Sequence, residues 1–168
     1  MTQTRDMRAK SSQITDSGEI RELLENCGIC RLGFSERGTP YVIPINYGYT
    51  YENDIISTYY HSSREGRKLD ILMDNPLVCF EADRVIRLDP DKNPDRNAVV
   101  WESIIGTGIM REVTDFNEKR LMLGNMMKVF IRYNPYYRPT PLTDSRVINI
   151  LMLKLVLDEY KAKRLYHI

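Results

Sequence analysis

The residues best suited to chemistry lie in the stretch 59–70, which has the sequence YYHSSREGRKLD. Before it the chain is β-branched and aromatic, as in a strand, and Ser62 and Glu65 then have the spacing of a capping box at a helix N-terminus. The free N–H groups of such a helix end favour anions, and the cations of Arg67 and Lys68 add charge. The stretch therefore predicts a phosphate site. The alternative is an ordinary capped helix with a basic, solvated end.

Two further residues of this stretch favour a ligand. Gly66 falls in the first helical turns, where glycine costs ~1 kcal/mol relative to alanine, and a ligand approaching the backbone would explain it. His61 is the one candidate for chemistry beyond binding, because an ordinary histidine pKa of ~6.5 suits proton transfer near neutral pH. The alternative for His61 is structural: its ring only hydrogen-bonds a ligand or caps the helix.

A second pattern, Cys27-Gly28-Ile29-Cys30, has the spacing of a redox motif. Such a motif lowers its thiol pKa by opening a helix, whereas here an amphipathic helix over residues 18–26 ends at Cys27, with Gly28 as the expected C-terminal cap. Redox catalysis is therefore disfavoured. Zinc is disfavoured too, since no second close pair of cysteines or histidines completes a set of four ligands.

Composition narrows the class of protein. The chain has 168 residues, with 24 basic against 23 acidic side chains and a net charge of +1, so no strong field attracts nucleic acid or an anionic membrane. It has no apolar run long enough to span a bilayer and no signal-like start. Three cysteines form no disulfide framework. We expect one domain over residues 1–168 in a cytoplasmic protein.

The periodicity of apolar residues predicts a mainly β chain with short helices. We expect a flexible arm over 1–16, helices over 18–26, after 62 and after 115, strands over 29–35, 40–49, 54–60, 77–81, 98–113 and 147–158, and exposed loops over 84–97 and 133–146. The loop 133–146 could cover a pocket. On the helix after 115, Leu123, Met127 and Phe130 share one face.

Glycine and proline positions refine this arrangement. Pro44 removes a ladder donor, so its strand should lie at an edge, a bulge or a ligand face. Gly106 and Gly108 lie two apart in the long strand, where either the sheet bends or a planar ligand contacts the backbone. About six antiparallel strands then predict a barrel, and the absence of Gly-x-Gly-x-x-Gly argues against a Rossmann site.

Three segments, 40–49, 61–70 and 103–108, occur together in the order and at the separations of a known family. With them the chain resembles the FMN-binding split-barrel family related to pyridoxamine 5′-phosphate oxidase, and within it the nitroimidazole-resistance proteins. The resemblance covers roughly residues 20–133 and the last strand. It implies a homodimer of split β-barrels with FMN in the groove between subunits.

The resemblance also implies a role for particular residues. Arg67 and Lys68, with Ser62 and the backbone near Gly66, would hold the FMN phosphate. The other flavin contacts implied are, at the isoalloxazine edge, Ile45, Asn46 and Tyr47; beside the ribityl chain or ring, Tyr60 and His61; and, from the long strand, Ser103.

One departure from the family bears on the substrate. The oxidase itself ends in a motif with arginine and tryptophan that handles pyridoxal, whereas this chain carries KRLYHI at 163–168 and its one tryptophan is Trp101. The resemblance thus implies an FMN-dependent oxidoreductase acting on another small planar molecule, with a nitro compound as a candidate. Two alternatives stay open: a flavin or haem module, with His61 and His167 as the available axial ligands, or a structural barrel with an empty groove.

Overall fold

The structure, a computed structural model, describes residues 12–166. In this part of the chain, eight strands form one antiparallel sheet in the order β3-β2-β6-β7-β8-β5-β4, with β1 paired to β8. The strands are β1 Gln13–Ile14, β2 Cys30–Glu36, β3 Thr39–Ile45, β4 Gly48–Glu52, β5 Ile55–Ser62, β6 Leu77–Asp89, β7 Ala98–Glu112 and β8 Leu151–Tyr166. The predicted mainly β antiparallel class is confirmed.

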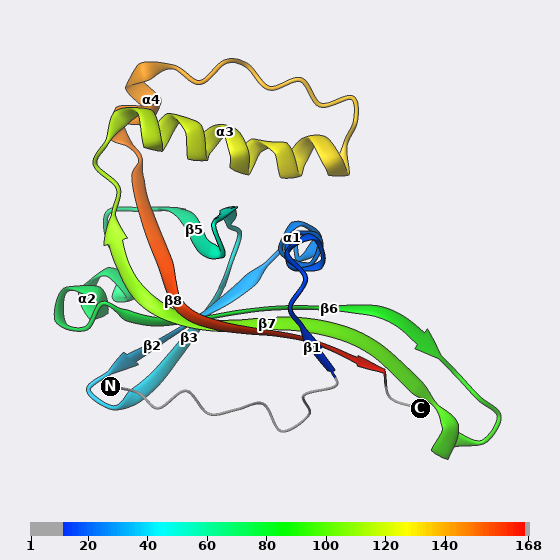
Figure 1. Cartoon of the computed structure of the whole chain (residues 1–168). Helices are drawn as coiled ribbons and strands as arrows, with labels where there is room; N and C mark the ends of the chain where they lie inside the picture. The colour runs from blue at the N-terminus through cyan, green and yellow to red at the C-terminus, as the bar shows by residue number, and fades with distance from the viewer. Residues whose placement is uncertain (1–11, 167–168) are drawn as a thin grey trace.

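Short helices cover parts of the sheet (Figure 1). They are α1 Ser17–Asn26, α2 Arg67–Asp74, the 3-10 turn η2 Pro94–Arg96, α3 Phe116–Tyr133 and α4 Asp144–Asn149. Asp16 caps α1 by accepting a hydrogen bond from the Glu19 amide at 2.9 Å, and Asp115 caps α3 through the Glu118 amide at 2.7 Å. The predicted start of the helix after 115 is therefore confirmed.

The sheet curves strongly along β7 and β8 (Figure 1). The pairing register of these two strands shifts between Thr107 and Gly108, and a Cβ added at Gly108 would overlap the carbonyl oxygen of Val156. Gly108 is therefore needed for the close approach of two backbones at a bulge, which supports the predicted bend and not a ligand contact.

Two tight turns join β2 to β3 and β4 to β5. Arg37 and Gly38 have φ angles of 49° and 86°, and Asn53 and Asp54 have φ angles of 50° and 62°. Positive φ at both central residues is the mark of the turn that best matches strand twist. Of the three positions predicted from Pro44, an edge, a bulge or a ligand face, the structure shows the edge, because β3 ends the sheet.

Four predicted segments differ in the structure. Residues 84–89 continue β6 and pair with β7, so the first half of the predicted loop 84–97 is wrong; charges on a two-stranded arm resemble those of a loop. Strand 40–49 breaks between β3 and β4 at Asn46.

Residues 144–149 form α4, where a loop and a strand start at 147 were predicted, because a short apolar run fits either period. Residues 13–14 of the predicted arm 1–16 form β1 and Asp16 caps α1, whereas residues 1–11 lie outside the described residues.

A buried carboxylate joins α1 to the sheet. Glu102 on β7 is fully buried and accepts hydrogen bonds from Arg84 on β6 at 2.6 Å and from Arg164 on β8 at 2.8 Å. The same arginines bond to α1, through Glu22 at 3.4 Å and Glu19 at 2.8 Å. Three strands and one helix thus meet at a single buried negative charge.

None of the helices formed by residues 12–166 is both long and apolar enough to cross a membrane.

Candidate functional site

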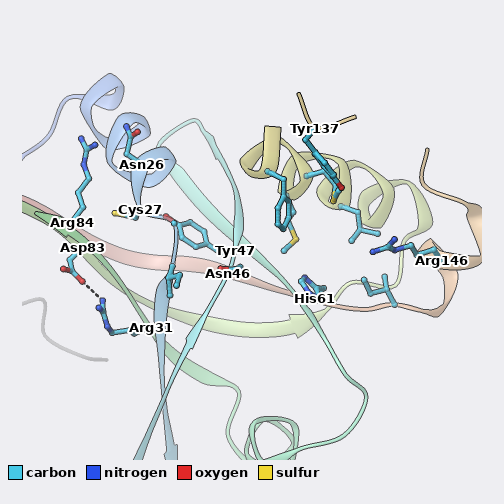
Figure 2. Close-up of a pocket in the computed structure, with 17 residues that line it drawn as sticks. Asn26, Cys27, Arg31, Asn46, Tyr47, His61, Asp83, Arg84, Tyr137 and Arg146 are labelled. Carbon is cyan, nitrogen blue, oxygen red and sulfur yellow. Dashed lines mark hydrogen bonds and ion pairs between the residues drawn. The ribbon is translucent and has the colours of Figure 1, made fainter. Parts of the chain in front are cut away.

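A cavity of about 770 Å³ lies between α1, α3 and the part of the sheet where β3 passes into β4 (Figure 2). This volume falls in the range of ~300–1,000 Å³ that is typical of small-molecule sites. The cavity has two ends, one near α1 with Arg31, Asp83 and Arg84, and the other beneath α3 with His61, Tyr137 and Arg146 (Figure 2).

Three of the predicted flavin residues line this cavity, Asn46 and Tyr47 at its centre and His61 toward the α3 end (Figure 2). Asn46 and Tyr47 lie in the break between β3 and β4, and His61 lies near the end of β5. The Tyr47 ring is buried and meets the Phe80 ring edge-on, with 5.5 Å between the ring centroids. Its hydroxyl donates to the Leu24 carbonyl at 2.7 Å. Tyr47 is therefore a fixed wall, whereas Asn46 and His61 are exposed and present polar atoms to the cavity.

The α1 end of the cavity carries compensated charge. Arg31 donates to Glu81 at 2.8 Å and also pairs with Asp83. Arg84 is held by Glu102. These cations were not singled out from the sequence, although Glu81 and Asp83, two apart and so on one face of a strand, could have indicated a cationic cross-strand partner.

The wall that α3 contributes to the cavity is apolar. It consists of the side chains of Leu123, Met126, Met127 and Phe130, with Tyr137 from the segment after the helix. Leu123, Met127 and Phe130 therefore share a face as predicted, but that face borders the cavity, and Phe130 is 53% exposed. Tyr137 places the predicted loop 133–146 over a pocket. Arg146, from α4, is a cavity cation that the sequence reasoning missed. Thr143 could have indicated the start of α4, because its side chain caps that helix.

The predicted phosphate site has a different local structure. Helix α2 begins only at Arg67, and the capping box predicted from Ser62 and Glu65 is wrong, because β5 continues through Ser62 and no side chain caps the helix. The Ser62 hydroxyl donates to the neighbouring Ser63 carbonyl at 2.7 Å. Gly66 is the N-cap residue with φ of 128°, a conformation open to glycine, and this explains its presence without a ligand.

The two predicted phosphate cations differ in their partners. Arg67 donates to Glu36 at 2.6 Å and lies over the Tyr41 ring, 4.3 Å from its centroid. Its charge is therefore already compensated. Lys68 has no ion-pair partner within residues 12–166, so its charge is available to an anion at the start of α2. Neither residue lines the cavity beneath α3.

Three other predicted residues do not line the cavity either. Tyr60 is fully buried in the main core, where its hydroxyl donates to Thr58 at 2.7 Å, and burial raises the Tyr60 pKa well above its ordinary value. Ser103 is buried on β7, and Ile45 packs at the edge of the core. A strand alternates its faces, so neighbours of cavity residues naturally point into the core.

The cysteine pair lies beside the α1 end. Burial raises the pKa of both Cys27 and Cys30 to about 12, which leaves both thiols protonated at neutral pH. Cys27 is itself the C-cap of α1, and Gly28 has no positive φ, so the predicted glycine cap is wrong. The expectation that these thiols are poor nucleophiles agrees with their burial.

Comparison with known proteins places this site in context. A family model described as pyridoxamine 5′-phosphate oxidase matches residues 16–164. No curated protein matches the chain. A crystal structure of a putative 5-nitroimidazole antibiotic resistance protein from Bacteroides thetaiotaomicron is 27% identical with a TM-score of 0.73, over 92% of this chain and 87% of the other.

Two more distant structures share the fold. The flavocytochrome Anf3 from Azotobacter vinelandii is 19% identical with a TM-score of 0.71, over 97% of this chain and 73% of the other. A FAD and heme binding protein from Mycobacterium smegmatis is 17% identical with a TM-score of 0.70, over 90% and 72%. Together with the nitroimidazole-resistance structure, these matches assign the described sheet to the split-barrel fold.

Proposed function

Because the chain belongs to the pyridoxamine 5′-phosphate oxidase family, we propose that it binds a flavin, FMN, and serves as an oxidoreductase for a small planar molecule. The observation that carries this proposal is the cavity of about 770 Å³, whose apolar wall on α3 faces the polar atoms of Asn46 and His61. A flavin ring has flat apolar faces and a polar edge, and these walls fit both.

The start of α2 fits the phosphate of the same cofactor. Ser62 directly follows His61, so the chain leads from the cavity to the N-terminus of α2 within a few residues. There, free backbone N–H groups and the unpaired ammonium group of Lys68 suit a phosphate dianion. Arg67 would contribute less, because Glu36 already binds it.

A bound flavin supplies electron and hydride transfer, and the protein supplies orientation and proton control. His61 would hold the proton at the cavity side of the flavin, within reach of a reducible substrate. A nitro compound is the substrate class that we favour, since the similar Bacteroides thetaiotaomicron structure is of a putative 5-nitroimidazole resistance protein.

We further propose that two copies of the chain form the complete flavin groove. The arm formed by β6 and β7 exposes a row of apolar side chains, among them Val85 at 56% and Leu88 at 65% exposure. Apolar rows of this kind mark interaction surfaces, and a two-fold pairing would cover both arms. Light scattering should give twice the mass of one chain; a monomer that retains flavin would contradict this part of the proposal.

The decisive experiment for the cofactor is release by denaturation, followed by the absorbance and mass of what is released. FMN would support the proposal, and colourless protein would contradict it. A Soret band would instead support the haem alternative, for which His61 lies at the cavity and His167 lies outside the described residues.

The role of His61 can then be tested by His61→Ala. As a proton donor, it should leave FMN bound and lower turnover of a reducible substrate by ~10²-fold or more, with loss of a pH dependence near neutrality. If His61 is only structural, flavin affinity and turnover should fall together. Wild-type values for both would exclude either role.

A further inference from the structure

Arg146 stands out among the cavity residues by its lack of a partner. Its guanidinium group makes no hydrogen bond or ion pair with any described residue, although the side chain lines the cavity. The other two arginines of the cavity, Arg31 and Arg84, each have two carboxylate partners. Arg146 is therefore the cavity arginine whose charge is uncompensated within residues 12–166.

Arg146 also has no evident task in holding α4. That helix is anchored by fully buried Val147, by the ion pair between Asp144 and Arg120, and by Lys119, which donates to the Ile150 carbonyl at 3.1 Å. The Thr143 hydroxyl caps its start. The backbone of Arg146 is thus fixed by its neighbours, while its side chain is left to face the cavity.

The surroundings of Arg146 describe the molecule that would use it. Figure 2 shows Arg146 at the same end of the cavity as His61 and Tyr137. Leu123, Met127 and Phe130 form the wall above this end. An aromatic ring could lie against this wall, and a guanidinium group offers a planar fork of donors that matches a carboxylate or phosphate.

We propose that Arg146 determines substrate specificity by binding the anionic group of a planar aromatic substrate that enters the α3 end of the cavity. This inference rests on the proposed function, since the substrate must reach a flavin bound in the same cavity. The same anion chemistry could come from the cofactor phosphate, and the experiment below separates the two sources.

The test compares an anionic probe with a neutral one of the same shape. Binding of para-nitrobenzoate and para-nitrobenzamide is measured on the flavin-loaded protein, through the change in flavin absorbance, for the wild type and for Arg146→Gln. We expect the wild type to bind the benzoate ~10-fold or more tightly than the benzamide, as a charge-assisted hydrogen bond predicts. Arg146→Gln should remove this preference and leave benzamide binding unchanged, and Arg146→Lys should restore part of it.

Lys128→Gln serves as the matched control, because Lys128 is exposed on α3 and does not line the cavity. It removes the same charge and should keep the preference for the benzoate. A wild type without the preference, or an Arg146→Gln variant that keeps it, would overturn the inference while the flavin assignment stands. Loss of flavin from Arg146→Gln would overturn it as well, by assigning Arg146 to the cofactor. A wild type that purifies without flavin would instead refute the proposed function itself.

Discussion

Replacing Glu102 by glutamine should destabilise the protein strongly. The carboxylate is fully buried and bonds two arginines, Arg84 at 2.6 Å and Arg164 at 2.8 Å. Glutamine keeps the volume but removes the charge, and its amide N–H₂ would face guanidinium donors. Two cations would then remain in a partly buried site without their common partner.

The magnitude follows from the geometry. Two unit charges about 4 Å apart attract by ~4 kcal/mol at an effective dielectric constant of ~20. Removing one partner of a buried pair costs ~3–5 kcal/mol in proteins. Arg84 and Arg164 are 27% and 20% exposed and have second partners on α1, so we expect a loss of about 3 kcal/mol, at the lower end of that range.

Denaturant unfolding followed by circular dichroism gives the free energy of unfolding directly, and the melting temperature should fall by about 6–12 °C for a chain of this size. Amide hydrogen exchange should also become faster in α1, because Glu19 and Glu22 are held by the same arginines. Glu112→Gln is the control, since its contact with Arg64 at 3.9 Å is exposed and should contribute less than ~1 kcal/mol. Equal losses in the two variants would refute the reasoning.

Three further predictions concern other regions. Lys68→Ala should lower FMN affinity by ~10-fold or more, and Arg67→Ala by much less because its charge is compensated; equilibrium dialysis of FMN checks this, and equal effects would contradict it. Gly108→Ala should destabilise the protein by about 1–3 kcal/mol or more, because the added carbon overlaps β8. Gly124→Ala has nothing within 4 Å of the added carbon and should stabilise α3 by up to ~1 kcal/mol. The melting temperature should therefore fall in the first variant and rise in the second. The Cys30 pKa is about 12 in the folded state against 9.0 ordinarily, so stability should fall as the pH rises above about 9, by ~1.4 kcal/mol per pH unit. Unfolding of the wild type and Cys30→Ala at about pH 8 and about pH 10 should show the difference between them shrinking.

Much of the fold follows from local patterns. The helix start after 115, the edge position of Pro44 and the bend at Gly108 each depend on a few neighbouring residues, and each is among the arrangements that the sequence predicts. These signals are steric or concern hydrogen bonds over short distances, so the rest of the chain changes them little.

Features that depend on distant partners could not be predicted in this way. Arg84 was assigned to an exposed loop because its carboxylate partners Glu22 and Glu102 are remote in sequence. Ser62 and Glu65 had the spacing of a capping box, but pairing of β5 with β8 extends the strand through Ser62 and delays the helix. Tyr60 shows the same limit, since the face of a strand that meets the core is set by the sheet.

The central place of β8 has a consequence for how the chain folds. This strand lies between β7 and β5 and also pairs with β1, which precedes it by about 150 residues. At translation rates of ~5–20 residues per second, β1 and β5 are made on the order of ten seconds before the strand that joins them. Until then the edges of β5 and β7 lack their partner, and most of the pairing is long in range, which slows folding. The nascent chain should therefore depend on chaperones during this interval, and deletion of β8 should leave an aggregating chain rather than a smaller barrel.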